Sequence, residues 1–371
     1  MDKLKRFVDC YIDTETCNFK CHYCYIALLN KFNKKIVKFS RSPEEIRNAL
    51  SKERLGGTCL LNFCAGGETL LSDDVIPVLK VLLEEGHYVM VVTNGSLTKR
   101  FEQIKEFNKE LLERLFFKFS YHYLELKRLN MIDRFFNNIK MMRDAGCSFT
   151  LEITPSDELI PYIDDVIKIS EEKLGAKPHC TIARDDRKKT IDVLSKYDFE
   201  EYKKIWSKFD SNLFDFKKNI FYIKRKEFCY AGDWSIYVNL SNGDMKQCYC
   251  GRTIDNIYKD VTKPLKFEAI GKNCSLAHCY NGHAFLALGD ILELKTPTYA
   301  SLRDRECKDN THWLSKKMYD FMSQKLFDNN KEYNEKEKAK INRSYKIKNF
   351  KSKPKILLKK VVRKLNDKKN G

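Results

Sequence analysis

The sequence predicts an α/β fold in which a partial (β/α)6 barrel of the TIM type precedes a small cysteine-rich β-hairpin/helix domain and a basic C-terminal tail. Three observations predict this fold: apolar runs alternate with amphipathic stretches over the first half of the chain, cysteines gather after residue 228, and lysines gather near the end. We therefore divide the 371 residues into a barrel (1–200), a linker helix with the cysteine-rich domain (201–310) and a helical, basic extension (311–371).

Six short apolar runs carry the barrel prediction. Each has the length of a buried strand and is rich in β-branched or aromatic residues. Strands that alternate with helices usually pair in parallel through right-handed crossovers, although periodicity alone also fits a doubly wound open sheet. The runs are Phe7–Ile12, Cys59–Cys64, Tyr88–Thr93, Leu115–Ser120, Ser148–Thr154 and Pro178–Ala183.

Amphipathic stretches between these runs predict the helices. The first opens with Ser42, Pro43 and two glutamates, which is a good N-cap followed by proline and acids in the first turn. Beyond the barrel, two β-rich runs flank Asn242-Gly243 and predict a β-hairpin. The expected helices are Ser42–Lys52, Asp74–Glu85, Arg134–Ala145, Pro161–Lys173, Phe199–Lys208, Tyr299–Asp304 and Trp313–Phe327, and the hairpin strands are Ser235–Leu240 and Met245–Tyr249.

Three cysteines follow the first run with the spacing C-x3-C-x2-C: Cys17, Cys21 and Cys24. Three thiolates on one loop suit a soft metal. A structural zinc ion normally takes four protein ligands. Each of the four irons of a [4Fe–4S] cluster is usually held by a thiolate, so three cysteines leave one iron open. A zinc knuckle completed by His22 or a distant cysteine, or three unrelated buried thiols, fit the spacing too.

The segment from Cys17 to Cys24 resembles the cluster motif of the radical S-adenosylmethionine (SAM) enzymes, C-x3-C-x-Φ-C, with Tyr23 as its aromatic residue. Ala65–Glu68 (AGGE) follows the second run and matches the GGE motif of that family, and Val92–Gly95 (VTNG) follows the third run. The resemblance covers roughly residues 7–185. It implies that Cys17, Cys21 and Cys24 hold three irons of a [4Fe–4S] cluster, that SAM chelates the fourth, and that reductive cleavage yields a 5′-deoxyadenosyl radical that abstracts a substrate hydrogen.

The same resemblance implies a set of SAM contacts: Tyr23, Gly66, Gly67, Glu68, Ser120 and Arg184. The glycines would let the backbone approach the ligand, and Glu68 would accept from the SAM ammonium. Ser120 and Arg184 lie at carboxyl ends of expected strands, where ligand groups of parallel barrels gather, but a hydrogen bond or ion pair of the fold explains each equally well. His122 and Glu152 lie at the same edge, and Glu152 sits in an apolar run, which predicts a buried partner.

Cys229, thirteen residues, Gly243, four residues and Cys248 resemble the first half of the extension found in the SPASM and twitch subgroups of the radical SAM enzymes. This implies one auxiliary iron–sulfur cluster held by Cys229, Cys248, Cys274 and Cys279, with Cys250 and Cys307 as spare ligands, because no seven-cysteine array exists. A zinc site of Cys274, Cys279 and either His278 or His283 is the alternative. The remaining thiols are expected in the core: Cys10, Cys59, Cys64, Cys147 and Cys180.

The net charge of +18 is concentrated in the last 56 residues, which hold 19 Lys and Arg against 6 Asp and Glu, a net of +13. Within them, Pro354–Asn366 resembles a basic amphipathic helix suited to an anionic membrane surface, and a solvated terminus or a helix docked on its own domain is the alternative. Few aromatic residues lie between the basic residues of this segment, which disfavours nucleic acid as its partner. Since no long apolar run or secretory signal is present and free thiols need a reducing compartment, we expect a cytoplasmic protein, with peripheral contact at the inner membrane face.

These features favour a radical SAM oxidoreductase or modifying enzyme that receives electrons from a donor such as flavodoxin or ferredoxin. The segment Cys274–Arg305 looks like a form found in radical SAM proteins of bacterial surface-polysaccharide gene groups, which implies a carbohydrate-related small-molecule substrate. Maturation of a peptide or protein, of the RiPP or sulfatase type, is the alternative within the family. A zinc-stabilised nucleic-acid-binding protein is the alternative of another class.

Overall fold

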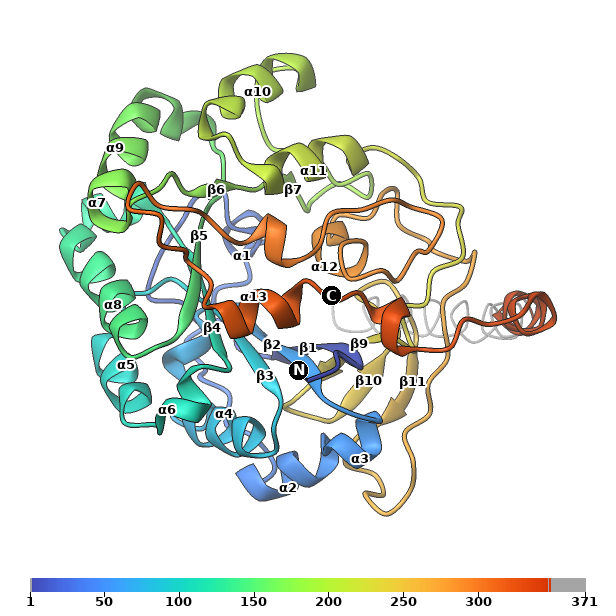
Figure 1. Ribbon diagram of the computed structural model, residues 1–371. Helices are drawn as coiled ribbons and strands as arrows, with labels where there is room; N and C mark the ends of the chain where they lie inside the picture. The colour runs from blue at the N-terminus through green and yellow to red at the C-terminus, as the bar shows by residue number, and fades with distance from the viewer. Residues whose placement is uncertain (1, 346, 348–371) are drawn as a thin grey trace, which may run out of the picture.

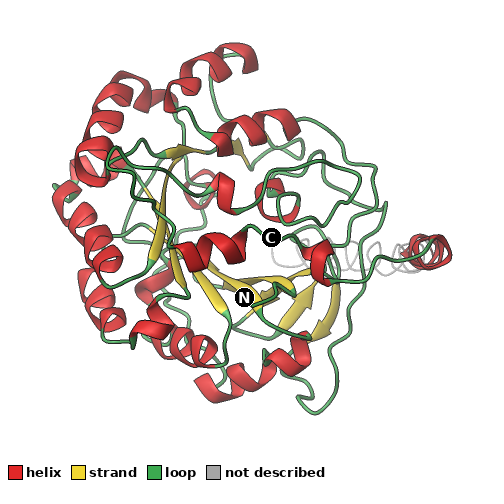
Figure 2. Ribbon diagram, in the orientation of Figure 1, coloured by secondary structure: helices red, strands yellow, loops and turns green. Residues whose placement is uncertain are grey.

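The computed structural model describes residues 2–345 and 347 and is built on one nine-stranded sheet with the order β11-β10-β9-β1-β2-β3-β4-β5-β6 (Figures 1 and 2). The six expected strands are all present and pair in parallel in sequence order. Along these six strands the order has no reversal. The strands are β1 (Arg6–Ile12), β2 (Cys59–Ala65), β3 (Tyr88–Thr93), β4 (Leu115–Ser120), β5 (Ser148–Ile153) and β6 (His179–Cys180).

Helices lie along the outer side of this sheet, between successive strands (Figure 1). Ser42 caps α2 in a capping box with Glu45, as the sequence predicts, and Gly175 ends α9 with a φ of 81°. The helices of this part are α1 (Tyr25–Leu28), α2 (Pro43–Ala49), α3 (Lys52–Leu55), α4 (Val75–Glu84), α5 (Thr98–Lys105), α6 (Lys109–Leu112), α7 (Tyr123–Arg128), α8 (Ile132–Asp144) and α9 (Ile163–Leu174), with 3-10 turns at Thr69–Leu71 and Asp157–Tyr162.

Both faces of the sheet are buried, and successive side chains along a strand enter different cores. Leu61, Val91 and Phe117 belong to the core under the outer helices. Their neighbours Leu60 and Met90 belong to a second core, formed with C-terminal segments. Burial on both sides explains why these strands are continuous apolar runs rather than alternating ones.

The C-terminal half supplies the second core and covers the inner face of the sheet, where Figure 1 shows α13 (Lys316–Met322) in front of β2 and β3. Helix α13 is shorter than the expected Trp313–Phe327 because Ser315 caps its start, and the expected helix at Tyr299–Asp304 is a 3-10 turn, Ala300–Leu302. The other elements are α10 (Phe199–Trp206), α11 (Asn212–Ile220), α12 (Gly282–Phe285), the short strands β7 (Arg184–Asp185) and β8 (Asp192–Val193), and 3-10 turns at Ser207–Phe209 and Leu326–Asn329.

The expected hairpin is confirmed as β9 (Ser235–Asn239) and β10 (Asp244–Lys246), turning at Gly243 with a φ of 81°. Two features were not expected. Strand β11 (Thr253–Asn256) pairs with β10, and β9 pairs in parallel with β1, so the cysteine-rich region continues the same sheet. A parallel pairing across more than 220 residues has no local signal in the sequence.

The expected basic helix at Pro354–Asn366 lies outside the described residues. Of the helices that are described, none has the length and apolar character that crossing a membrane requires.

Candidate functional site

Two adjoining hollows lie at the carboxyl ends of the parallel strands, where ligands of such sheets bind. The first, here called the cysteine pocket, is lined by the three cysteines of the first loop and by Gly66, Gly67, Glu68 and Ser120. The second, here called the central cavity, has a volume of about 510 Å³. Cys24, Cys64, Ala65 and His122 line both, so the two hollows adjoin at these residues.

The cysteine pocket brings together the three predicted cluster ligands. The Cys17 Sγ accepts from the Phe19 N–H at 3.4 Å and lies 3.9 Å from the Asn94 amide nitrogen. Burial raises the pKa of the Cys17 thiol to about 12, and that of Cys21 is raised for the same reason. A metal must therefore displace the protons of these thiols as it binds.

Within the described residues, no three His, Cys, Asp or Glu side chains are close enough together to hold a single metal ion. A four-iron cluster does not need such an arrangement, because each thiolate binds a different iron. His22, which could complete a zinc knuckle, points instead to the surface, where its Nε2 lies 2.7 Å from the Glu158 carboxylate. The residues of the first loop thus fit a polynuclear cluster.

The two glycines after β2 pack directly against the cysteine loop. The Gly67 N–H donates to the Thr14 carbonyl at 2.5 Å, and the Glu68 N–H donates to the Thr16 carbonyl at 3.1 Å. A Cβ on Gly67 would overlap the Thr16 carbonyl, and one on Gly66 would lie 2.9 Å from the Thr14 carbonyl. These glycines therefore position the cysteine loop itself, in addition to lining the pocket.

Replacing Gly67 with alanine is expected to displace the cysteine loop, since the added methyl group meets backbone that no rotamer change can move. We expect a loss of about 1–3 kcal/mol in stability, which is the usual cost of overpacking, together with weaker iron retention. Iron per chain and urea denaturation measure both. His22→Ala on the same loop is the control, because this exposed side chain pairs with Glu158 and lies edge-on to the Tyr23 ring but does not line the cysteine pocket. Equal iron content in Gly67→Ala and His22→Ala would contradict the role of Gly67.

Glu68 ties the end of β2 to the end of β3. Its carboxylate accepts from the Thr93 hydroxyl and the Asn94 N–H, both at 2.7 Å, and from the Leu70 N–H at 3.0 Å. Burial raises the pKa of this carboxyl, while the three hydrogen bonds favour the charged form. Both oxygens thus have partners within the chain, and the expected contact of Glu68 with SAM stays a prediction.

The other predicted SAM contacts divide between the two hollows. Ser120 lines the cysteine pocket, whereas Tyr23 and Arg184 line the central cavity. The Tyr23 hydroxyl lies 2.6 Å from the His122 Nδ1, and burial lowers the pKa of His122 to about 4, so this imidazole is neutral. Arg184 lies 3.8 Å from the Asp186 carboxylate and its guanidinium stacks over the Tyr280 ring at 4.6 Å.

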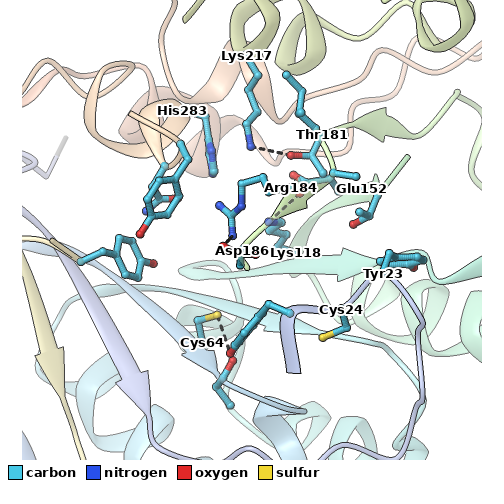
Figure 3. Close-up of a pocket in the computed structure, with 18 of the residues that line it drawn as sticks. Tyr23, Cys24, Cys64, Lys118, Glu152, Thr181, Arg184, Asp186, Lys217 and His283 are labelled. Atoms are coloured by element: carbon cyan, nitrogen blue, oxygen red, sulfur yellow. Dashed lines mark hydrogen bonds and ion pairs between the residues drawn. The ribbon is translucent and has the colours of Figure 1, made fainter. Parts of the chain in front are cut away.

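The central cavity holds charged groups that the sequence did not single out (Figure 3). Glu152, as expected, has a buried partner: Lys118 lies 2.9 Å away, and Arg303 donates to its other oxygen. Lys217 donates to the Thr181 hydroxyl at 2.7 Å. Lys118 could have been identified from the sequence, because a lysine inside the apolar run of β4 is unusual. Lys217 and Arg303 could not, because the sequence does not show where their segments lie in the fold.

The second cysteine group gathers in one place the four predicted auxiliary ligands and a fifth thiol: Cys229, Cys248, Cys250, Cys274 and Cys279. The Cys250 thiol lies close to those of Cys248 and Cys274, so this spare cysteine is a full member of the group. Cys307 is not, because its Sγ donates to the Leu174 carbonyl in the other core. His283, a ligand in the zinc alternative, lines the central cavity instead.

Residues 11–157 match the model of the Radical SAM superfamily. This span contains the cysteine loop, the two glycines and Glu68, so it is a radical SAM domain, and its cofactors are a [4Fe–4S] cluster and SAM. The described residues fit these cofactors, since three thiols line a pocket that adjoins a larger cavity.

Over 86 residues the chain is 30% identical to a Methanocaldococcus jannaschii protein named "Putative glycyl-radical enzyme activating enzyme MJ1632", a match that covers 23% of this chain and 31% of that protein. Among solved structures, it is similar to Streptococcus suis SuiB bound to SAM, with a TM-score of 0.49 and 15% identity over 70% of this chain and 64% of SuiB. It is also similar to anSMEcpe with bound SAM, with a TM-score of 0.48 and 17% identity over 68% of this chain and 79% of anSMEcpe. The chain thus spans less than two thirds of the length of MJ1632 and of SuiB.

Proposed function

We propose that this protein is a radical SAM enzyme in which Cys17, Cys21 and Cys24 hold three irons of the cluster. The observation that carries the proposal is that the pocket lined by the three cysteines adjoins the central cavity at Cys24, Cys64, Ala65 and His122. SAM bound at the open iron would extend from one space into the other, and a substrate in the cavity would meet its 5′-carbon.

When bound, the reduced cluster supplies the electron that splits SAM into methionine and a 5′-deoxyadenosyl radical, which removes a hydrogen atom from the substrate. The chain holds and shields the reactants. Gly66 and Gly67 would admit the ligand at the backbone, Tyr23, Ser120 and Arg184 would contribute further SAM contacts, and Glu68 holds the adjoining loop. Six tyrosines line the cavity and would help to exclude water: Tyr11, Tyr23, Tyr25, Tyr237, Tyr249 and Tyr280.

We further propose that the sequential sheet forms a partial (β/α)6 barrel and that residues 201–310 form a twitch-like module. In this module Cys229, Cys248, Cys274 and Cys279 would hold one auxiliary cluster, with Cys250 able to replace one of them. Tyr280 connects the second cysteine group with the central cavity, since it follows Cys279 in the chain and lines the cavity. The auxiliary cluster would thus lie where it can accept the electron left on an oxidised substrate.

A cavity of about 510 Å³ has the size of a small-molecule site, which favours the carbohydrate-related substrate over a peptide. A flavodoxin or ferredoxin would reduce the cluster in the cytoplasm, and the basic C-terminal tail would dock on the inner membrane face. Peptide maturation would require a chain to enter this cavity, and comparing sugar derivatives with peptides as substrates separates the two proposals.

The decisive experiment is anaerobic reconstitution with iron and sulfide, followed by reduction in the presence of SAM. We expect iron and sulfide near two four-iron clusters per chain and release of 5′-deoxyadenosine on reduction. Retained zinc without SAM cleavage would overturn the proposal and favour the zinc-stabilised nucleic-acid-binding protein.

Replacing Cys229 and Cys248 together with alanine is expected to halve the iron content while SAM cleavage without substrate continues at close to its normal rate. The reason is that both thiols belong to the second cysteine group and neither lines the cysteine pocket. Iron analysis and chromatography of 5′-deoxyadenosine check the two halves of this prediction. Unchanged iron content, or loss of SAM cleavage in a protein that keeps half its iron, would contradict it.

A further inference from the structure

We propose that the central cavity binds its substrate through an anionic group, a phosphate or a carboxylate, held by Lys217 with Arg184 and His283 beside it. This inference rests on the proposed function in one respect, because it takes the central cavity to be the substrate site. The observations that carry it are an excess of cationic side chains in the cavity and two buried nitrogen-bearing groups that the chain leaves without an anionic partner.

Among the residues that line the cavity, Lys118, Lys217 and Arg184 are cationic and Glu152 and Asp186 are anionic. Glu152 already balances two cations, since it pairs with Lys118 at 2.9 Å and with Arg303, which is fully buried behind the cavity wall. Asp186 lies 3.8 Å from Arg184, both partly exposed. The cavity therefore carries a surplus positive charge. Lys217 is the lining cation that forms no ion pair with a carboxylate, although Glu152 lies near enough to act against the lowering of its pKa.

Lys217 is held in this position by the fold. It lies on α11, its residue is only 4% exposed, and its ammonium points into the cavity towards the Thr181 hydroxyl (Figure 3). Burial, followed by the charge of Arg184, lowers the pKa of Lys217 to about 7. A buried ammonium without a counter-ion is costly, and a bound anion would remove that cost.

His283 approaches the same space from α12 (Figure 3). Its Nδ1 is buried and has no hydrogen-bond partner among the described residues. Burial and the nearby cations Arg303, Lys217 and Lys118 lower the pKa of this imidazole, so it is neutral in the empty cavity. An imidazole N–H aimed at a phosphate or carboxylate oxygen would satisfy it, and the anion would favour the charged forms of both Lys217 and His283.

The carboxylate of SAM could also be the anion that this site binds, because the proposed function makes Arg184 a SAM contact as well. Lys217 and His283, however, line only the central cavity, whereas the three cysteines and the two glycines line the cysteine pocket. A substrate anion therefore predicts that the cavity still binds an anion after SAM has saturated its own site.

The test is calorimetric titration of the reconstituted, SAM-saturated protein with glucose 1-phosphate, glucuronate and glucose at constant ionic strength. We expect saturable binding of at least one of the two anions and none of uncharged glucose. Lys217→Met and Arg184→Gln should each weaken that binding about tenfold or more, because each removes a charge-assisted hydrogen bond. Lys168→Gln on α9, a highly exposed lysine paired only with Glu172, removes the same charge and should leave binding unchanged.

Three results would overturn the inference: no binding of either anion, equal binding by wild type and both cavity variants, or anion binding that disappears once SAM is saturating. If Lys217→Met fails to fold, His283→Ala decides the outcome, because His283 lines only the central cavity whereas Arg184 is also a proposed SAM contact; His283→Ala should weaken anion binding in the same way. SAM cleavage by the wild-type preparation separates the two proposals. Cleavage without anion binding overturns this inference alone, whereas anion binding without cleavage overturns the proposed function and leaves the anion site standing.

Discussion

Replacing Cys17, Cys21 and Cys24 together with alanine is expected to abolish reductive SAM cleavage and to leave the iron of the second cysteine group in place. The three thiols line one pocket beside Gly66 and Gly67, and no described residue from the second group lines it. Without thiolates a cluster has no ligands in this pocket, so 5′-deoxyadenosine should fall to the level of a protein-free control. The iron content should fall by about half, as one of two four-iron clusters is lost.

The control for this variant is Cys147→Ala, which removes a buried thiol at the start of β5, away from both hollows. It should keep the full iron content and SAM cleavage. Formation of 5′-deoxyadenosine by the triple variant would show that the assignment of the cluster ligands is wrong.

Replacing Glu152 with glutamine is expected to destabilise the fold by about 3–5 kcal/mol, the usual cost of removing one partner from a buried ion pair. The Glu152 residue is 7% exposed and Arg303 is fully buried, so the substitution would leave Lys118 and Arg303 facing each other without a counter-charge. Urea denaturation of the reconstituted protein measures the loss. Glu171→Gln, which breaks a surface pair with Lys308, should cost no more than about 1 kcal/mol.

The pH dependence of stability in wild type and Glu152→Gln tests whether the ion pairs of Glu152 cause this loss. Burial alone would raise the pKa of Glu152, but Lys118 and Arg303 outweigh it and hold the pKa well below the ordinary value of 4.5. A carboxyl whose pKa is lower in the folded than in the unfolded state stabilises the fold above the unfolded pKa and loses that effect as the pH falls. The advantage of wild type over Glu152→Gln should therefore be constant near neutral pH and shrink below about pH 4.5. An advantage that grows on acidification would contradict this account.

Local patterns predict the barrel strands and the cysteine pocket because both depend on short stretches of chain. An apolar run such as Leu115–Ser120 is buried on both faces and forms β4, and the ends of β1, β2 and β3 meet because parallel strands in sequence order place their carboxyl ends at one edge. The spacing of Cys17, Cys21 and Cys24 needs only one loop. The position of these three cysteines in one loop could therefore be predicted from the sequence without knowledge of the fold.

The charged lining of the central cavity could not be predicted because it depends on contacts between distant segments. Lys217 lies on a helix that the sequence analysis did not identify, and Arg303 reaches Glu152 across 151 positions. The sequence marks Cys250 only as a spare ligand, because its short separation from Cys248 gives no indication that a loop 24 residues later brings Cys274 close to it. In each case the residues that come into contact are determined by how the C-terminal half packs on the sheet.

That packing has a consequence for how the molecule assembles. Strand β1 is bordered on one side by β2 and on the other by β9, which is synthesised more than 220 residues later. Until β9 emerges from the ribosome, β1 is an open edge with unpaired backbone groups, and the inner apolar side chains of β1 to β4 have no cover. Such late, long-range closure makes folding slow and leaves incomplete chains prone to self-association. The nascent protein therefore depends on the second half of its chain to pair this edge and to cover the inner face of the sheet.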